Sequence, residues 1–425
     1  MRRMLYPARD EWSRLCLRPQ AQEAEMRPRV QAILERVKRE GDRALFDLSR
    51  RFDRVNLEKL SLPVPERVAM AAPLREAIDR ARANIEKFHR AQRREERTVE
   101  TEAGVSCWRR AVAIERVGLY IPGGSAPLFS TLLMLAVPAR LAGCGEVVLC
   151  TPPGANGAVD EAILYTARLL GFEKIYTVGG AQAIAAMSYG TESVPRVDKI
   201  FGPGNQYVTL AKQMVQTEGV AIDMPAGPSE LLVISDAGGN PAYIAADLLS
   251  QAEHGADSQV VFVTTAPELL DAVEREIERQ RPRLPREGIA RRALENSMMV
   301  LLKDLDEALD FSNRYAPEHL ILATEQAAKR VDAVINAGSV FLGPFSCESA
   351  GDYASGTNHT LPTNGYARAY SGVSLDSFVK WITYQKISAG GMKNIGPAIE
   401  TMAAAEQLDA HKNAVTIRLK DIENV

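Results

Sequence analysis

Short runs of apolar residues alternate with glycine-containing turns and amphipathic stretches through most of the chain. Apolar residues recur at helical spacing at 30–51 and 74–94, and further helices are predicted at 159–170, 241–253 and 267–279. Strands that alternate with helices in this way predict parallel sheets with right-handed crossovers. We therefore predict an α/β fold with two Rossmann-like parallel-sheet domains, one inserted in the other, plus small N- and C-terminal extensions. The apolar runs predict strands at 117–121, 146–150, 174–178, 199–201, 230–234, 259–264, 298–302, 320–323 and 339–342.

The predicted domain boundaries follow the changes in this pattern. The N-terminus has weak periodicity, and the region after it holds two amphipathic helical stretches and a hairpin that turns at Gly104. Near the C-terminus we predict a flexible glycine-rich connection at 388–396, a helix at 397–410 and a short strand at 415–419. The segments are an arm at 1–21, a discontinuous domain of 22–116 and 230–370, an inserted domain at 117–229, and a C-terminal segment at 371–425.

Composition narrows the class of protein. The chain has 425 residues, more than one ordinary domain, and its 46% hydrophobic and 25% charged residues are typical of a soluble globular protein. A net charge of −3 gives no reason to expect nucleic acid or a membrane surface as partner. The apolar run at 128–139 contains Pro138 and is too short to span a membrane. Five cysteines without a CxxC pair, and an N-terminus without a signal peptide, predict a cytoplasmic protein with no disulfide framework.

The stretch SAGDYASGTNHTLPT, residues 349–363, is small, polar and rich in turn residues. We predict a loop there, with no core strand or helix. Loops of this kind bring polar groups within reach of ligands. The stretch presents one carboxylate, Asp352, and one imidazole, His359.

Gln251 and His254 lie three residues apart at a predicted helix end, so they share a face. With Asp352 and His411 they form a mixed nitrogen and oxygen set that suits Zn²⁺ or another divalent ion. A set drawn from three distant segments is not specific, so a structural role for each histidine stays open.

Glu318 and His319 follow Pro317. A carboxylate and an imidazole are the usual general bases near neutral pH. Adjacent residues of an extended segment point apart, which lets the two side chains serve different steps. For an isolated pair the simpler interpretation is a turn with solvated charges.

Glycine-rich turns at 122–124, 179–180 and 202–205 each follow a predicted strand and precede a predicted helix. Free backbone N–H groups and the positive helix end favour a phosphate at such a turn. None matches the GxGxxG or P-loop pattern, and close helix packing explains any one of them equally well. From residues alone, two hypotheses stay open: a metal-assisted enzyme with a nucleotide cofactor, and a two-domain binding protein that holds a metal. The pair of bases favours the enzyme.

Long motifs are spread over most of the chain in a definite order. They are GLYIPGG at 118–124, GGAQAIAA at 179–186, FGPGNQYV at 201–208, AGPSE at 226–230, QAEHG at 251–255, APEHL at 316–320, SAGDYASGTNHTLPT at 349–363 and AHKNAVTIR at 410–418. In both sequence and order these motifs resemble the histidinol dehydrogenase family. The N-terminus and 367–395 carry less of the resemblance.

The resemblance implies an NAD- and zinc-dependent, four-electron oxidation of L-histidinol to L-histidine through L-histidinaldehyde, the last steps of histidine biosynthesis. His319 would take the alcohol proton, and Glu318 would activate the water that adds to the aldehyde. The implied zinc ligands are Gln251, His254, Asp352 and His411. The implied NAD contacts are Tyr120, Gln182 and Asn205.

The implied substrate contacts are Ser229, His359 and Glu406, together with His319 and the four zinc ligands. The resemblance also implies NAD binding by 117–229, metal binding and catalysis by 22–116 with 230–370, and a homodimer in which 371–425 completes the partner's active site. Glu406 and His411 are five residues apart, so both reach one site only if the predicted helix ends or turns between them. The alternative is a relative on the same scaffold that oxidises another small diol or amino alcohol.

Overall fold

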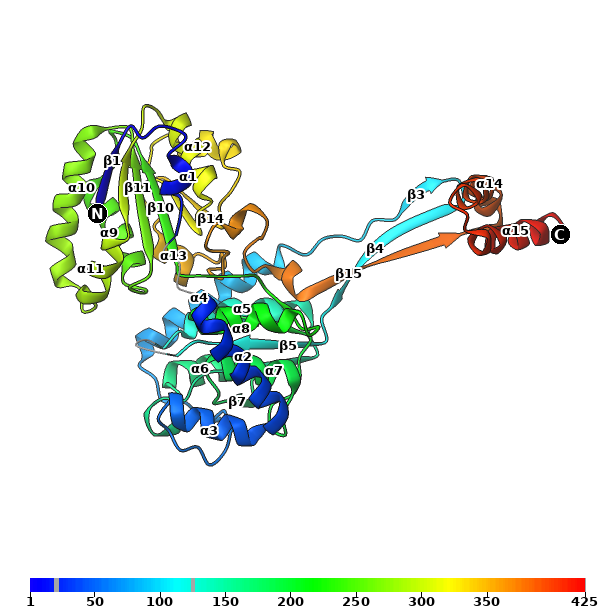
Figure 1. Ribbon diagram of the computed structural model, residues 1–425, viewed down its shortest axis with the longest axis horizontal. Helices are drawn as coiled ribbons and strands as arrows, with labels where there is room; N and C mark the ends of the chain where they lie inside the picture. Colours follow the sequence, from blue (N-terminus) through cyan, green and yellow to red (C-terminus); the bar gives the residue numbers. More distant parts are fainter. Residues whose placement is uncertain (19–22, 124–126, 425) are drawn as a thin grey trace. The chain divides into compact units, whose positions relative to one another are not determined.

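The protein is described here by a computed structural model that covers residues 1–18, 23–123 and 127–424 (Figure 1). The chain forms two compact units, one of residues 1–91 and 114–378, the other of residues 92–113 and 379–425. Within the described ranges, no helix has both the length and the apolar composition needed to cross a membrane.

The first unit contains two sheets, and the one we call the outer sheet takes its strands from both ends of that unit's chain (Figure 1). Its strands are all parallel, in the order β1 (Arg2–Leu5), β12 (Met298–Leu301), β11 (Gln259–Thr264), β10 (Glu230–Ser235), β13 (His319–Leu322) and β14 (Ser339–Leu342). Helices cover both faces, so strands β10 to β13 are buried along their length. One face packs against α9 (Pro241–Ala252), α10 (Pro267–Gln280) and α11 (Glu287–Glu295), and the other against α1 (Trp12–Leu15) and α12 (Leu305–Tyr315).

The second sheet of this unit, the inserted sheet, is formed by the middle of the chain. Its order is β2 (Ser61–Pro63), β7 (Lys174–Tyr176), β6 (Glu146–Cys150), β5 (Arg116–Tyr120), β8 (Lys199–Phe201) and β9 (Ala221–Ile222), with only β2 antiparallel. One face packs against α2 (Glu23–Glu40), α3 (Asp42–Phe52), α7 (Gly180–Tyr189) and α8 (Gln206–Gln216). The other packs against α5 (Phe129–Ala142) and α6 (Glu161–Leu169), and α4 (Ala72–Arg90) packs on α5.

The two sheets share one topology. If strands β5–β9 are numbered 1 to 5 along the chain, and β10–β14 likewise, both sets have the spatial order 3-2-1-4-5. Each sheet also has one strand from the N-terminal region, which lies beside the third strand of the set: β2 beside β7, and β1 beside β12. This order is that of a doubly wound α/β domain. The predicted fold class is confirmed, and each predicted apolar run contains a strand. Short 3₁₀ helices complete the unit: η1 (Ala155–Gly157), η2 (Arg281–Arg283), η3 (Ala327–Ala333), η4 (Tyr366–Arg368) and η5 (Leu375–Phe378).

The N-terminal third of the chain differs from the prediction. The arm predicted at 1–21 begins with strand β1, which pairs with β12 at the edge of the outer sheet. A strand of four residues is too short to show periodicity. The region 22–116 was grouped with 230–370, yet α2 packs on α7 and α8, and β2 pairs with β7 of the inserted sheet. The apolar stripe of a helix does not reveal which sheet it covers.

The second unit is a three-stranded antiparallel sheet followed by two helices. The sheet has the order β15 (Val379–Ile387), β4 (Val105–Ala113), β3 (Val99–Glu102), which confirms the hairpin at Gly104. The helices are α14 (Ala389–Ala405) and α15 (Asp409–Glu423). Because β15 pairs with β4 along its whole length, this unit starts at 379 rather than at 371 and includes 92–113.

Two predictions near the C-terminus are wrong. The glycine-rich stretch 388–396 is not a flexible connection but the cap and first turns of α14, where the Ser388 hydroxyl accepts a hydrogen bond from the backbone N–H of Gly391. Its glycines serve close packing: a Cβ on Gly391 would lie 2.3 Å from the carbonyl oxygen of Gly104, and one on Gly396 would lie 2.9 Å from Leu419. The predicted strand at 415–419 lies within α15, where its residues pack on α14.

Candidate active site

The polar stretch 349–363 contains more regular structure than predicted. Glu348–Tyr353 form a short helix, α13, and the residues after it are irregular. The helix presents Asp352 to three imidazoles. Oδ1 of Asp352 lies 3.8 Å from Nε2 of His319 and 3.8 Å from Nδ1 of His359, and Oδ2 lies 4.0 Å from Nε2 of His254. The structure therefore brings these four predicted site residues together.

Gln251 lies in the last turn of α9, and His254, which belongs to this cluster, follows the C-terminal end of that helix. Gln251 is completely buried, and neither its amide oxygen nor its nitrogen has a hydrogen-bond partner among the described residues. Such a buried group costs about 1–3 kcal/mol unless something satisfies it. The Nδ1–H of His254 donates to the carbonyl oxygen of Ser250 at 3.0 Å, which leaves Nε2 as the lone-pair nitrogen facing Asp352.

This donor set fits a divalent metal. Potential ligand atoms of His254, Glu348 and Asp352 lie within 4.8 Å of one another. An unpaired amide oxygen, an imidazole whose second nitrogen is fixed by a hydrogen bond, and a carboxylate are the ligands and outer contacts expected of a zinc site. Residues Gln251, His254 and Asp352 could hold the ion.

Glu348 is a site residue that the sequence analysis missed. It is buried, accepts a hydrogen bond from the Ser250 hydroxyl at 3.2 Å, and stands four residues before Asp352 on α13. Burial raises the pKa of Glu348 well above its usual value, and the nearby Asp352 and Glu318 carboxylates raise it further. The i, i+4 spacing was visible in the sequence, but it carries meaning only once the segment is known to be a helix.

Glu318 and His319 are not the solvated turn that an isolated pair suggested. They are only 5% and 3% exposed, and His319 is the first residue of β13. The prediction that their side chains point apart is wrong, since Nδ1 of His319 lies 3.6 Å from Oε2 of Glu318. The strand begins only at His319, so the alternation of an extended segment does not govern Glu318.

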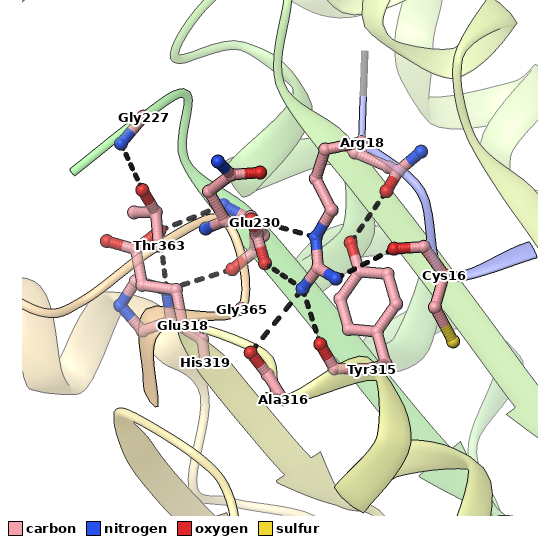
Figure 2. A network of polar contacts seen from close by, with 12 residues as sticks. Cys16, Arg18, Gly227, Glu230, Tyr315, Ala316, Glu318, His319, Thr363 and Gly365 are labelled. Atoms are coloured by element: carbon pink, nitrogen blue, oxygen red, sulfur yellow. Dashed lines mark hydrogen bonds and ion pairs between the residues drawn. The ribbon is translucent and has the colours of Figure 1, made fainter. Parts of the chain in front are cut away.

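The main chain of Glu230 contacts both bases (Figure 2). Its N–H donates to Oε2 of Glu318 at 2.8 Å, and its carbonyl oxygen lies 3.2 Å from Nδ1 of His319. Only an N–H can bond to a carbonyl, so the proton of neutral His319 resides on Nδ1. Nε2 of His319, which has no hydrogen-bond partner among the described residues, keeps its lone pair.

Burial sets the protonation of both groups. It lowers the pKa of His319 to about 4, so the ring is neutral near neutral pH. It raises the pKa of Glu318 well above its usual value, and the Glu230 and Asp352 carboxylates add to that rise while the Glu230 N–H opposes it. A neutral imidazole with a free Nε2 and a carboxylate of raised basicity can both accept protons.

His359 and Ser229 are two further predicted substrate contacts in the first unit. His359 is directed by two contacts: its Nδ1–H donates to the backbone carbonyl of Asp352 at 3.0 Å, and its Nε2 lies 3.2 Å from the Thr131 hydroxyl. Burial lowers the pKa of His359. Ser229 is half-buried and directly precedes β10.

Glu406 and His411 belong to the second compact unit, where both are exposed. Glu406 caps the end of α14 and His411 lies in the first turn of α15. The helix predicted at 397–410 is present as part of α14, but it ends at Ala405, five residues earlier than predicted. Gln407 follows it with φ 59°. The chain thus turns between the two residues, at the end of α14 and before α15.

The predicted NAD contacts line one cavity of about 960 Å³ in the first unit. Tyr120 ends β5, Gln182 lies in the first turn of α7, and Asn205 caps α8 by accepting from the N–H groups of Tyr207 and Val208. The Tyr120 hydroxyl also accepts from the N–H of Gly180 at 3.0 Å. The cavity lies at the carboxyl ends of the inserted strands, the usual place for a nucleotide. Gly124, in the first predicted turn, lies outside the described residues.

A second part of the cavity lining comes from α2, α3 and the residue after α3, which the sequence analysis assigned to the other domain. It includes Arg29, Arg51 and Asp53. Arginines suit a phosphate-bearing ligand. No sequence motif marks these residues, because they reach the cavity only through the packing of α2 and α3 on the inserted sheet.

Known proteins match this chain over nearly its full length. The family model described as histidinol dehydrogenase matches residues 16–419. The chain is 57% identical over 427 residues to the histidinol dehydrogenase of Bacteroides thetaiotaomicron, covering 100% of both chains. It is 54% identical to the chloroplastic histidinol dehydrogenase of Arabidopsis thaliana, covering 93% of this chain and 86% of that one.

A solved structure agrees. The crystal structure of histidinol dehydrogenase from Elizabethkingia anophelis superposes with a TM-score of 0.97 at 54% identity, covering 100% of this chain and 99% of that one. Together these matches show that the chain is an oxidoreductase that belongs to the histidinol dehydrogenase family.

Proposed function

We propose that the protein oxidises L-histidinol to L-histidine through L-histidinaldehyde, with two NAD consumed per substrate, in the last steps of histidine biosynthesis. The observation that carries the proposal is the buried neutral His319 next to the buried Glu318. Nε2 of His319 faces Asp352 and has no hydrogen-bond partner within the described ranges of the chain. A binding protein has no need for two buried bases in one site. Family membership supports the choice of substrate.

In the first half-reaction, Nε2 of His319 accepts the hydroxyl proton of the alcohol while the adjacent carbon loses a hydride. The hydrogen bond from Nδ1–H to Glu230 keeps the lone pair on Nε2 and stabilises the ring as it becomes positively charged. The product of this half is the aldehyde.

In the second half-reaction, Glu318 accepts a proton from the water that adds to the aldehyde carbon, and the hydrate then loses a second hydride to give the carboxylate. The raised pKa of Glu318 makes its carboxylate a stronger base than an exposed one. Its burial keeps bulk water away from the aldehyde.

Gln251, His254 and Asp352, joined by the partner subunit's His411, would hold Zn²⁺. When bound, the ion would fix the imidazole and amino nitrogens of the substrate. Ser229, His359 and the partner subunit's Glu406 would contact the substrate. In this proposal 371–425 reaches the partner's site, and the active form is a homodimer.

Tyr120, Gln182 and Asn205 would hold NAD in the cavity of the inserted sheet, which accounts for the proposed assignment of 117–229. NAD, when bound, supplies the hydride acceptor for both half-reactions. The N-terminal end of α8 and the neighbouring backbone N–H groups suit its pyrophosphate.

The test is the number of NADH molecules formed per L-histidinol consumed, before and after removal of metal by a chelator. We expect two NADH per substrate, no turnover after chelation, and recovery when Zn²⁺ is added back. A single NADH would show that the aldehyde escapes. No NADH from histidinol, with metal still bound, would instead indicate the alternative, another small diol or amino alcohol.

The shared site is tested separately by mixing two inactive variants, His411→Ala and His319→Gln. Each mixed dimer would contain one site with both native residues, so activity should return to about a quarter of the wild-type level after complete subunit exchange. Neither variant alone should show it. If verified heterodimers stay inactive, the two residues act within one chain.

A further inference from the structure

The carboxylate of Glu230 makes a buried ion pair at the amino end of the central strand β10. Arg18 binds it in a two-pronged arrangement, with Nε 3.1 Å from Oε1 and Nη2 2.7 Å from Oε2. The two side chains are only 7% and 2% exposed. The backbone N–H of Asn364 donates to the same Oε1. Both oxygens of the carboxylate are therefore fixed.

Arg18 is itself held on all sides (Figure 2). Its Nη1 donates to the carbonyl of Cys16 at 2.9 Å, and its Nη2 donates to the carbonyl of Tyr315 at 2.7 Å. Its guanidinium stacks on the Tyr315 ring at 3.6 Å, and the Tyr315 hydroxyl donates to Gln259 at 2.8 Å. This rigid support connects the N-terminal segment to the strand that carries Glu230.

A buried ion pair is a poor device for stability alone. Removing two charges from water costs about as much as their attraction returns, and apolar residues of the same size often stabilise a fold equally well. The geometry of this pair is better explained by what the Glu230 main chain does. The N–H of Glu230 donates a hydrogen bond to Glu318, and its carbonyl oxygen accepts one from His319. One residue is thus the donor to one base and the acceptor from the other.

We propose that the Arg18–Glu230 pair is a positioning device for both bases: it fixes the Glu230 main chain so that its N–H orients the Glu318 carboxylate and its C=O holds His319 in the tautomer with a free Nε2. Arg18 and the Glu230 side chain are positioning residues, since they act through the main chain and contact no reacting atom. The inference rests on the roles proposed above for Glu318 and His319.

The experiment must separate positioning from stability. Arg18→Met alone leaves a buried carboxylate without its partner, so we expect a large loss of thermal stability. Arg18→Met combined with Glu230→Gln removes both charges together, so most of the lost stability should return. The double variant still lacks the two hydrogen bonds from Arg18 to Glu230 that, in our proposal, fix the Glu230 main chain. We expect its kcat to stay about 10–100-fold below wild type, the size of effect that a small misplacement of catalytic groups produces.

Two further readouts identify the mechanism. The kcat should fall by similar factors for histidinol and for histidinaldehyde, because Glu230 contacts both bases, while KM for either substrate changes less than about threefold. Nitrogen-15 NMR of the zinc-loaded enzyme, labelled at histidine, should show His319 protonated on Nδ1 in the wild type and a mixture of tautomers in the double variant. The signals of His319 are identified as those that are missing from the spectrum of the His319→Gln variant.

A matched control removes an exposed ion pair from the same part of the fold. Arg9 and Asp310 pair at 2.8 Å and are 65% and 54% exposed. Arg9→Met with Asp310→Asn should leave kcat and the His319 signal unchanged. The inference is overturned if the stable Arg18–Glu230 double variant has wild-type kcat and a single Nδ1–H tautomer. Failure of the proposed function would look different: the wild type itself would not oxidise histidinol, while the tautomer measurement would still report on the pair.

Discussion

The two sheets of the first unit have the same strand order, yet their candidate sites lie at opposite ends of the strands. In the inserted sheet the cavity lies at the carboxyl ends, beside Tyr120 and Asn205. In the outer sheet the bases lie at the amino ends, where Glu230 and His319 are the first residues of β10 and β13. Doubly wound sheets usually bind ligands at the carboxyl ends, so the outer sheet is the exception that needs a physical reason.

Helix direction supplies that reason. In a strand–helix–strand unit, the helix N-termini lie at the carboxyl ends of the strands and the helix C-termini lie at the amino ends. The first edge favours anions and the second favours cations. Asn205 begins α8 at the inserted cavity, whereas Gln251 and His254 lie at the C-terminal end of α9. One topology thus offers one edge suited to anions and another suited to cations, which in our proposal bind the phosphates of NAD and the metal ion.

The largest expected effect comes from removing the base at the amino edge. His319→Gln should lower kcat by about 10³-fold or more, because the amide of glutamine cannot replace the lone-pair nitrogen of the imidazole as a proton acceptor. Zinc content, measured by mass spectrometry of the metal, should stay at the wild-type level. His89→Gln is a matched control, since His89 is also buried, with its ring nitrogens beside the Ile85 carbonyl and the Asn358 amide and its ring against Phe88. If metal is lost as well, His319 is a ligand and its assigned role is wrong.

The second effect tests the metal edge through Gln251. Gln251→Leu removes a buried amide that has no hydrogen-bond partner among the residues that the structure describes, so the metal-free protein should become more stable by about 1–2 kcal/mol. Zinc affinity should fall by more than about 10–100-fold, the loss typical for an outer contact of a metal site. Gln259→Leu is the contrasting variant, because both ends of that amide are bonded. It should destabilise the fold and leave zinc affinity unchanged.

The third effect separates the two bases. Glu318→Gln should slow oxidation of the aldehyde by about 10–100-fold more than oxidation of the alcohol, because only the second half-reaction needs an activated water. Rapid-mixing measurements that start from either substrate give the two rates. Equal slowing of both halves would mean that the bases act as one unit. The Arg18–Glu230 double variant should differ from Glu318→Gln, because it is expected to slow oxidation of the alcohol and of the aldehyde by similar factors.

Much of this comparison could be predicted from sequence, because it depends on local patterns. Apolar runs and glycine turns gave the strands and their alternation with helices. The three-residue spacing of Gln251 and His254 placed both on one helix end, and the Glu318–His319 pair marked the bases. The assignment of roles to these residues came from the resemblance of whole motifs, and the roles themselves stay predictions.

The remainder depends on tertiary contacts that no local pattern encodes. Arg18 and Glu230 are 212 positions apart, and only the packed structure shows that they form a pair. Glu348 was missed because the segment was predicted as a loop, where an i, i+4 relation to Asp352 has no meaning. The glycines at 388–396 were interpreted as flexibility, although they allow close approach of backbone and helices.

The smallest expected effect probes the carboxyl edge. Gln182 is buried, lines the cavity of the inserted sheet, and is not an ionisable group. Gln182→Leu should raise KM for NAD by about tenfold, which is about 1.4 kcal/mol and the size of a single lost hydrogen bond. The kcat at saturating NAD and the zinc content should stay near wild type, because no charge or ligand at the amino edge changes. A fall in zinc content would show that the two edges are not independent, which would break the division between an anion-binding edge and a cation-binding edge. An unchanged KM for NAD would contradict the proposed contact between Gln182 and NAD.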